Sequence, residues 1–361
     1  MPKEGDKFLK SAVITDRVGH SLKMRWVNGK VAVVTFAVVF TACAIVFSDV
    51  ILGAATEAAK RFALNALSSV LLFTIASDML VKSGFGEVCK RVSGKLFPSM
   101  LGLNGGFAAP FIIGAVAGYP LGVKTVCDLY RRGACSKREA ESALALCSVP
   151  GLGFTVAFVG GVLWDDIRFG IAAWVSCLIG AVAVGVFGGI VLKKEGGSVG
   201  NEHDGGGAEA GSEFSVAEVL IESVGDAATT VLRVFGFVVF FNAVAAVLWG
   251  FTAWSGILED GASASVQAIT VSFFEFSSGV SQLVTCRFPS VCFFSRICID
   301  GADIARGLTV AVLAWSGMSV HMQSWGFTAS CGLSARKYYI GKAASVFISV
   351  CFYALTVCFA S

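Results

Sequence analysis

Residues Gly114–Phe158 read GAVAGYPLGVKTVCDLYRRGACSKREAESALALCSVPGLGFTVAF. The stretch is apolar enough for a membrane, yet it carries Lys124 and Asp128 and two groups of helix breakers, Gly118-Tyr119-Pro120 and Ser148-Val149-Pro150-Gly151. An interrupted helix frees backbone N–H and carbonyl groups, which at membrane depth are tolerated only inside protein or beside a water-filled cavity. Ionisable side chains in such a segment indicate a functional site. The stretch therefore predicts a binding site within a membrane protein.

The composition of the whole chain favours lipid as its solvent. Of the 361 residues, 55% are hydrophobic and 15% are charged, whereas soluble domains are usually about 25% charged. The formal net charge of +3 is too small to predict a nucleic-acid partner. The 12 cysteines include no CxxC pair and no His-Cys metal spacing, so we interpret them as small apolar residues packed between helices.

The N-terminal segment, residues 1–30, carries seven Lys/Arg residues and is followed at once by an apolar run, residues 31–53. This run exceeds the roughly 7–15 residues of a cleaved signal peptide, so it is interpreted as a first transmembrane span. Basic residues before a span place the N-terminus in the cytoplasm.

Residues 62–192 form a first unit of four elements. The chain has a span at Phe62–Val81, then the apolar segment Leu96–Tyr130, which is broken at Gly118-Tyr119-Pro120 and has basic residues on both flanks. Those flanks predict a re-entrant hairpin that enters and leaves on the cytoplasmic side. A helix over Ser136–Trp164 follows, capped by Ser136 with Glu139, broken at Ser148–Gly153, and succeeded by the span Ile171–Leu192.

Residues 193–214 are polar and Gly-rich, which predicts a flexible cytoplasmic linker. Residues 215–361 then repeat the same order of elements. A span at 231–251 precedes an apolar segment at 266–285 that is broken around Glu275. A helix at 302–328 is broken at Ser316–Ser319, and the last span covers 339–359. Arg336, Lys337 and Lys342 are taken to mark a cytoplasmic turn before that span.

The two units are predicted to have opposite orientations in the membrane. Gly122 after the first hairpin break corresponds to Gly279 after the second. With the N-terminus and the linker inside, the first hairpin opens toward the cytoplasm and the second toward the outside. Inverted repeats with discontinuous helices are typical of secondary transporters, whose site lies near mid-membrane where the repeats meet. The predicted fold is therefore an all-α polytopic membrane protein with two inverted repeats, each containing a re-entrant hairpin and a broken helix.

Three segments carry a family resemblance: GYPLGVKTVCDLYRRGACSKREAESALALCSVPG, EFSSGVSQL and WSGMSVHMQSWGF. They resemble the YlbJ-type sporulation integral membrane proteins of the nucleoside-recognition (Gate) family, which is related to concentrative nucleoside transporters. The resemblance covers roughly residues 60–360. It implies a sporulation membrane protein that carries dipicolinate or a nucleoside-like compound. The family usually has a pair of Asn residues before the Pro of the second break, where Ser148 and Val149 stand here.

The candidate site residues lie at or near the interruptions. Lys124 and Asp128 share one helix face, either as an anion-attracting pair or as a structural ion pair. Glu275 either binds a coupling ion or accepts hydrogen bonds from freed backbone N–H groups, and His321 is either a proton-sensitive gate or a core histidine. The full set of candidate substrate-binding residues is Tyr119, Lys124, Asp128, Ser148, Glu275, Ser278, Ser316, Ser319, His321 and Gln323.

The leading hypothesis is a transporter for a small organic solute, located in the cell membrane, without a resident cofactor or metal and coupled to Na⁺ or H⁺. Partial positive charge at half-helix N-termini would suit an anionic solute. The alternative is a non-transporting membrane scaffold or assembly protein that retains a carrier fold. An intramembrane enzyme is not favoured, because no HExxH or GxSxG motif is present. The expected partners are the lipid bilayer and the solute, with no nucleic acid, and a homo-oligomer is left open.

Overall fold

The computed structural model describes residues 29–93, 97–194, 215–255, 260–293 and 297–360. The predicted N-terminal segment up to residue 28 and nearly all of the predicted linker lie outside these ranges. The described chain is helical apart from one short antiparallel pair of strands, β1 and β2, in which Val291 pairs with Ile299. The predicted all-α class is therefore confirmed for the described residues.

Four helices are long and apolar enough to cross a membrane: Gly29–Val46, Ile167–Leu192, Val216–Thr252 and Arg336–Cys358. Many large apolar side chains on their outer faces are exposed, among them Val46 at 73% and Phe347 at 72%. Exposed apolar surface on this scale suits lipid rather than water. The chain is accordingly a membrane protein by the length, composition and surface of its helices.

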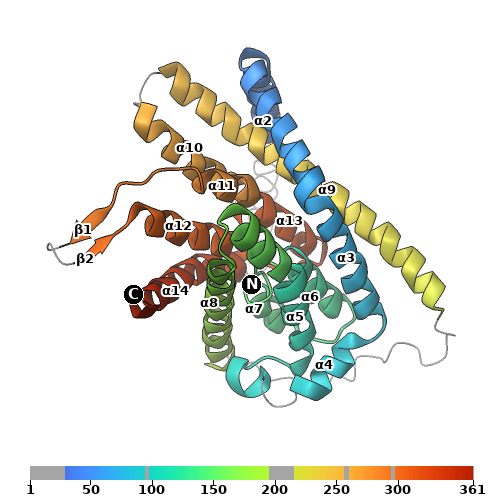
Figure 1. Cartoon of the computed structure of the whole chain (residues 1–361). Helices are drawn as coiled ribbons and strands as arrows, with labels where there is room; N and C mark the ends of the chain where they lie inside the picture. Colours follow the sequence, from blue (N-terminus) through green and yellow to red (C-terminus); the bar gives the residue numbers. More distant parts are fainter. Residues whose placement is uncertain (1–28, 94–96, 195–214, 256–259, 294–296, 361) are drawn as a thin grey trace, which may run out of the picture.

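The first half of the described chain is a succession of helices (Figure 1). After the helix Gly29–Val46, its elements are α2 Ser48–Arg61, the π-helix Phe62–Ala66, α3 Leu67–Lys82, α4 Phe85–Ser93, the π-helix Phe97–Leu101, the 3-10 turn Gly105–Phe107, α5 Ala108–Ala117, α6 Leu121–Arg131, α7 Lys137–Ala143, the π-helix Gly153–Leu163 and α8 Ile167–Lys194.

The second half begins with a single long helix. Its elements are α9 Val216–Ser255, α10 Asp260–Phe274, α11 Phe276–Leu283, β1 Val291–Phe293, β2 Ile297–Ile299, α12 Gly301–Trp315, α13 Gly317–Ser330 and α14 Arg336–Ala360.

Two predicted span boundaries are wrong. The first apolar helix ends at Val46, not Gly53, and α2 begins at Ser48 as the start of a bent helix that continues through α3 to Lys82. Residues 48–61 carry charges and a narrow apolar face with Ile51 and Ala58 buried, so their hydropathy is too low for a span. The first helix of the second half likewise begins at Val216 rather than at residue 231.

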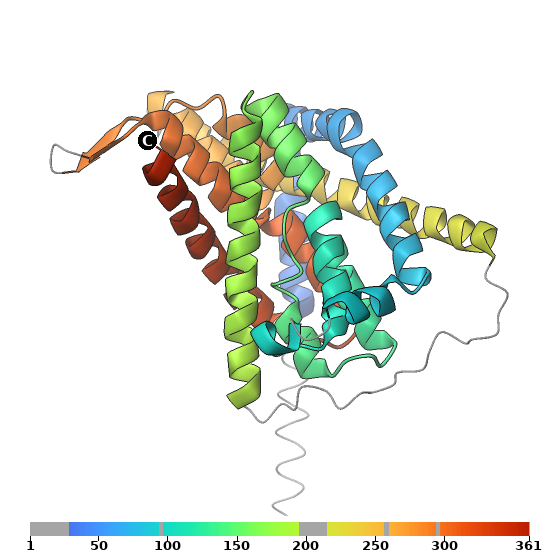
Figure 2. The ribbon, with the colours of Figure 1, turned by 60° about the horizontal axis from the view of Figure 1, so that its bottom comes forward.

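The corresponding long helices of the two halves pack against each other in antiparallel pairs. Along α2–α3 and α9, the ring of Phe62 contacts Phe235, and Lys82 pairs with Asp226. Along α8 and α14, an added Cβ on Gly180 would meet Ser345, and one on Gly341 would meet Val184. Small residues permit this close approach, as is common between membrane helices. Figure 2 shows α8 and α14 side by side.

All four predicted interruptions are present in the structure. The two hairpins fold back on themselves, because Gly122 returns beside Gly114 and Gly279 returns beside Ser272. The first broken helix is non-helical around Ser148–Gly151, and the second is broken at Ser316, which has a left-handed backbone with φ 80°. The helix-breaking residues thus act where their local chemistry predicts.

The core joins the two halves around these interruptions. One buried cluster combines α5–α7 with α8 and α14, and includes Phe107, Leu144 and Tyr338. A second cluster joins the π-helix 153–163 and α8 to α11, α12 and α14 through Phe169 and Leu313. Apolar packing therefore holds the interrupted segments of both halves together in the interior of the protein.

Candidate functional site

In the first half, the hairpin break lies directly against the broken helix. The backbone N–H of Tyr119 donates to the carbonyl oxygen of Val149 at 2.9 Å. Gly118 has φ 90°, and a Cβ on it would approach the backbone nitrogen of Gly151 to 2.8 Å. Only glycine adopts this conformation without strain and leaves room for the second chain. The two interruptions of the first half therefore form one unit.

The second half repeats this arrangement at Glu275 and Ser316. Gly317 follows Ser316 with φ 76°, and a Cβ on it would lie 3.0 Å from the backbone nitrogen of Phe276 and 3.2 Å from the carbonyl oxygen of Phe274. The break between α12 and α13 therefore packs directly against the break between α10 and α11.

Aromatic rings connect the two units. The ring of Phe276, at the start of α11, makes edge-to-face contacts with Tyr119 at 5.0 Å and with Phe154 at 5.2 Å between centroids. The two aromatic partners belong to the first half and Phe276 to the second. The four interruptions consequently meet in the interior, where Figure 1 shows α6, α11 and α13 between the flanking α8 and α9.

A small cavity of about 80 Å³ lies at this junction. Its walls combine aromatic rings with hydroxyl and amide groups, including those of Tyr119, Phe154, Phe276, Ser277, Ser319 and Gln323.

Several polar atoms buried around the junction have no hydrogen-bond partner among the described residues. A buried polar atom without a partner is costly, by about 1–3 kcal/mol, so their concentration at the interruptions indicates a place where a ligand would bond. These atoms are Tyr119 Oη, Ser316 Oγ, Ser319 Oγ, His321 Nε2 and Gln323 Oε1.

Lys342 contributes a cation to the same region. It is 1% exposed within α14, and its ammonium donates to the carbonyl oxygen of Ser148 at 2.9 Å. The same nitrogen lies 5.6 Å from the centroid of the Tyr119 ring. No ion pair joins Lys342 to a carboxylate in the described part of the chain. The expectation that Lys342 marks a cytoplasmic turn is wrong, since α14 begins at Arg336 and carries Lys342 inward.

Tyr338, one helical turn before Lys342, connects the two broken helices. Its hydroxyl lies 2.9 Å from Nδ1 of His321 and donates to Ser324 Oγ at 3.4 Å. The same hydroxyl is 3.5 Å from Ser148 Oγ. A polar network thus runs from the first broken helix through α14 to the second.

Glu275 has the geometry of the second alternative considered for it. It is the N-cap of α11, and its carboxylate accepts from the backbone N–H groups of Ser277 and Ser278 at 3.1 and 2.8 Å. The hydroxyl of Ser277 donates to the same carboxylate. Both carboxylate oxygens are therefore engaged in capping the half-helix.

Lys124 and Asp128 lie away from the junction, in a cleft of about 630 Å³ between α3, α6, α9 and α13. They do not pair with each other: Lys124 pairs with Asp78 of α3 at 2.7 Å, and Asp128 with Arg131 at 3.1 Å. The expected Lys124–Asp128 pair is thus replaced by one that ties the hairpin to α3. The charged residues lining this cleft are Asp78, Lys82, Lys124, Asp128, Arg131, Arg132, Asp226 and Arg233.

The cleft adjoins the central cavity. Thr230 of α9 lines both, and Thr74 in the cavity wall is one turn of α3 from Asp78. At the far end of the cleft, burial acts to lower the pKa of Lys82, but hydrogen bonds to Asp226 and Glu222 outweigh it and raise that pKa. Charged residues therefore lie next to the junction on this side.

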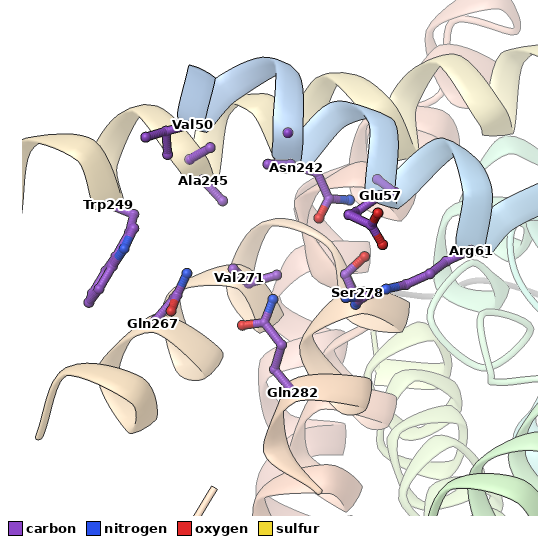
Figure 3. Close-up of a pocket in the computed structure, with 14 residues that line it drawn as sticks. Val50, Glu57, Arg61, Asn242, Ala245, Trp249, Gln267, Val271, Ser278 and Gln282 are labelled. Carbon is purple, nitrogen blue, oxygen red and sulfur yellow. The ribbon is translucent and has the colours of Figure 1, made fainter. Parts of the chain in front are cut away.

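Ser278 faces a different hollow. A cleft of about 260 Å³ lies between α2, α9, α10 and α11. Figure 3 shows Ser278 beside Asn242, Glu57 and Arg61, and Gln282 directed toward Val271. This cleft lies on the opposite side of α11 from Phe276. Of the candidate serines, Ser319 lines the central cavity, whereas Ser278 faces this second cleft.

Of the candidate residues, the structure brings Tyr119, Ser148, Glu275, Ser316, Ser319, His321 and Gln323 to the junction and its polar network. Sequence reasoning missed Lys342, Tyr338, Ser324 and Asp78. The spacing of Tyr338 and Lys342 at i and i+4, inside the last apolar helix, was the available signal.

The chain matches no protein-family model, no curated protein and no solved structure. No group of three or more His, Cys, Asp or Glu side chains suitable for a metal ion occurs within the described ranges. The site's chemistry is therefore argued from its own residues.

Proposed function

We propose that the chain is a multi-pass membrane transporter for a small organic solute, built from two inverted repeats. The observation that carries the proposal is the meeting of four interruptions, two from each half, around buried polar atoms without protein partners. Discontinuous helices placed in this way form the substrate sites of secondary transporters. No catalytic group arrangement enters the proposal.

The antiparallel pairing of corresponding helices supports the inverted relationship. If the halves are related by an axis in the membrane plane, each helix should run opposite to its counterpart. The pairs α2–α3 with α9, and α8 with α14, have this relationship. The hairpins also agree, since Gly122 and Gly279 each face the preceding helix within the first turn after the break.

The distribution of charge supports an orientation in the membrane. The cleft that contains Lys82, Arg131 and Arg132 is rich in basic residues, which favours a cytoplasmic position. At the opposite end, Asp166 pairs with Arg306 at 3.3 Å near the start of α8. In this orientation the first hairpin opens toward the cytoplasm and the second toward the outside.

The aromatic walls of the cavity and the buried cation behind Tyr119 favour a planar solute that carries a carboxylate. Dipicolinate satisfies both requirements, and a nucleoside-like compound satisfies the first. The resemblance to the nucleoside-recognition family offers the same two candidates and adds a sporulation role.

The test is flux in proteoliposomes containing the purified protein. Labelled pyridine-2,6-dicarboxylate and labelled uridine should be tried separately, with protein-free liposomes as the control. We expect saturable uptake of one of them, reduced by Tyr119→Ala. Binding without flux would instead support a scaffold that retains a carrier fold, and the absence of both binding and flux for all solutes tried would overturn the proposal.

A further inference from the structure

The ammonium of Lys342 occupies a position at the first broken helix that no other described cation shares. Helix α7 ends at Ala143, and the carbonyl oxygen of Ser148 lies in the non-helical segment that follows. That carbonyl accepts its hydrogen bond from Lys342, which arrives from α14, 194 residues away in the chain. A side chain from the second half thus satisfies a backbone group freed in the first.

The groups that face Lys342 provide no negative charge. They are Tyr119 of the hairpin break, Cys177 of α8 and His321 of α13, and the His321 ring is itself bonded to Tyr338 of α14. Glu275 interacts electrostatically with Tyr119. Both oxygens of its carboxylate already accept hydrogen bonds from Ser277 and Ser278. A buried ammonium without a carboxylate is energetically costly. The presence of Lys342 at this position therefore calls for a functional explanation.

Carbonyl groups exposed by helix unwinding are the usual ligands of the coupling cation in transporters with broken helices. Here one such carbonyl binds an ammonium that is covalently part of the protein. We propose that the ammonium of Lys342 takes the place of a free coupling cation at this site. Solute movement is then coupled to the protonation of Lys342 and requires no sodium ion. This inference rests on the proposed transport function.

The proposed cycle accounts for the proton at each step. With Lys342 protonated, the site carries one positive charge. One carboxylate of the solute, bound on the other side of the Tyr119 ring, neutralises that charge. The loaded site then opens to the other side of the membrane, and the pair of ammonium and carboxylate has no net charge during this step. After the solute leaves, the amine releases its proton on the same side, and the uncharged amine returns while still donating a hydrogen to Ser148. One proton therefore crosses with each solute molecule, and no electrons are exchanged. A solute with one carboxylate crosses without net charge, and pyridine-2,6-dicarboxylate, which has two, crosses with a net charge of −1.

A measurement without solute tests the cation itself. The purified protein should melt at the same temperature in sodium chloride as in choline chloride, because no sodium site is expected. Lys342→Ala should melt at a lower temperature, and methylammonium chloride should restore part of the loss where choline, which is too large, does not. A rise in the melting temperature of the unmodified protein specific to sodium would overturn the proposal.

A second measurement tests coupling with pyridine-2,6-dicarboxylate as the probe. In proteoliposomes, a pH gradient should drive its accumulation and a sodium gradient should not. Lys342→Gln keeps a hydrogen donor for Ser148 but cannot titrate, so it should exchange labelled for unlabelled solute without accumulation. Lys337→Gln, on the same helix near its cytoplasmic end, is the matched control and should accumulate normally. Accumulation by Lys342→Gln equal to that of the unmodified protein would exclude the coupling role.

The two failures can be told apart. If the unmodified protein neither binds nor moves any solute, the proposed function fails, and the coupling role fails with it. If solute moves but sodium drives it, the transport function stands and only the role of Lys342 is wrong.

Discussion

The ring of Tyr119 meets the ring of Phe276 edge-to-face, with the centroids 5.0 Å apart. Tyr119 stands at the turn of the first hairpin and Phe276 opens the half-helix after the second. Because this contact spans the two halves of the chain, it places the interruptions of both at one point. Four predictions follow from the structure, and the stability measurement in each needs no knowledge of the solute.

The close approach at Gly122 should not tolerate a side chain. A Cβ there would collide with the backbone carbonyl of Cys147 and lie 3.0 Å from the Cα of Gly114. We expect Gly122→Ala to lower stability by about 1–3 kcal/mol, the usual cost of overpacking, as measured by unfolding in mixed detergent. Gly307→Ala is the control, because no atom lies within 4 Å of its added Cβ. Equal stability of the two variants would show that the first hairpin does not pack as described.

The hydroxyl of Tyr338 should matter more than that of its neighbour. Tyr338→Phe removes the partner of His321 Nδ1 and leaves that buried nitrogen unpaired, which should cost about 1–3 kcal/mol. Tyr339→Phe is a matched control, since the ring of Tyr339 also contacts His321, at 5.4 Å, but no hydrogen bond of its hydroxyl to His321 is observed. The comparison of melting temperatures decides the point, and a larger loss for Tyr339→Phe would contradict the network.

Glu275 should act as a helix cap rather than as an ion carrier. Glu275→Gln replaces one acceptor oxygen by a donor and should destabilise the protein by about 1–2 kcal/mol, the scale of a lost N-cap. Transport measured at saturating solute should retain its ion dependence. A variant of normal stability whose ion dependence had changed would instead assign Glu275 to coupling.

The ion pair between Lys124 and Asp78 should be strongly coupled, because its side chains are only 16% and 10% exposed. Lys124→Met alone should cost about 3–5 kcal/mol, whereas the double variant with Asp78→Asn should recover much of the loss. A double-mutant cycle on unfolding free energies measures this coupling. The exposed pair of Lys60 and Glu57 is the control and should show at most about 0.5 kcal/mol.

The interruptions could be predicted from the sequence because they depend on local chemistry. Gly118 and Pro120 cannot continue an ordinary helix, and the capping box of Ser136 with Glu139 is present as predicted. The elements between them follow from apolar run length. These signals act over a few residues, so no tertiary information was needed to find them.

The partners of the charged residues could not be predicted in the same way. Lys124 has Asp128 one turn away in its own helix, yet it pairs with Asp78, 46 residues earlier, because α3 packs against the hairpin. Lys342 follows two basic residues, so it resembled part of a cytoplasmic turn. Its burial depends on the packing of α14 against α8 and on the position of the Ser148 carbonyl, neither of which leaves a local sequence signal.

The most direct test is a cryo-EM map of the protein in lipid nanodiscs with pyridine-2,6-dicarboxylate or uridine bound. We expect density for the molecule between Tyr119 and Phe276, within reach of Ser319 and Gln323, in a cavity wider than the present 80 Å³. Density confined to the cleft beside Ser278 or to the lipid-facing surface would contradict a solute site at the meeting point of the four interruptions.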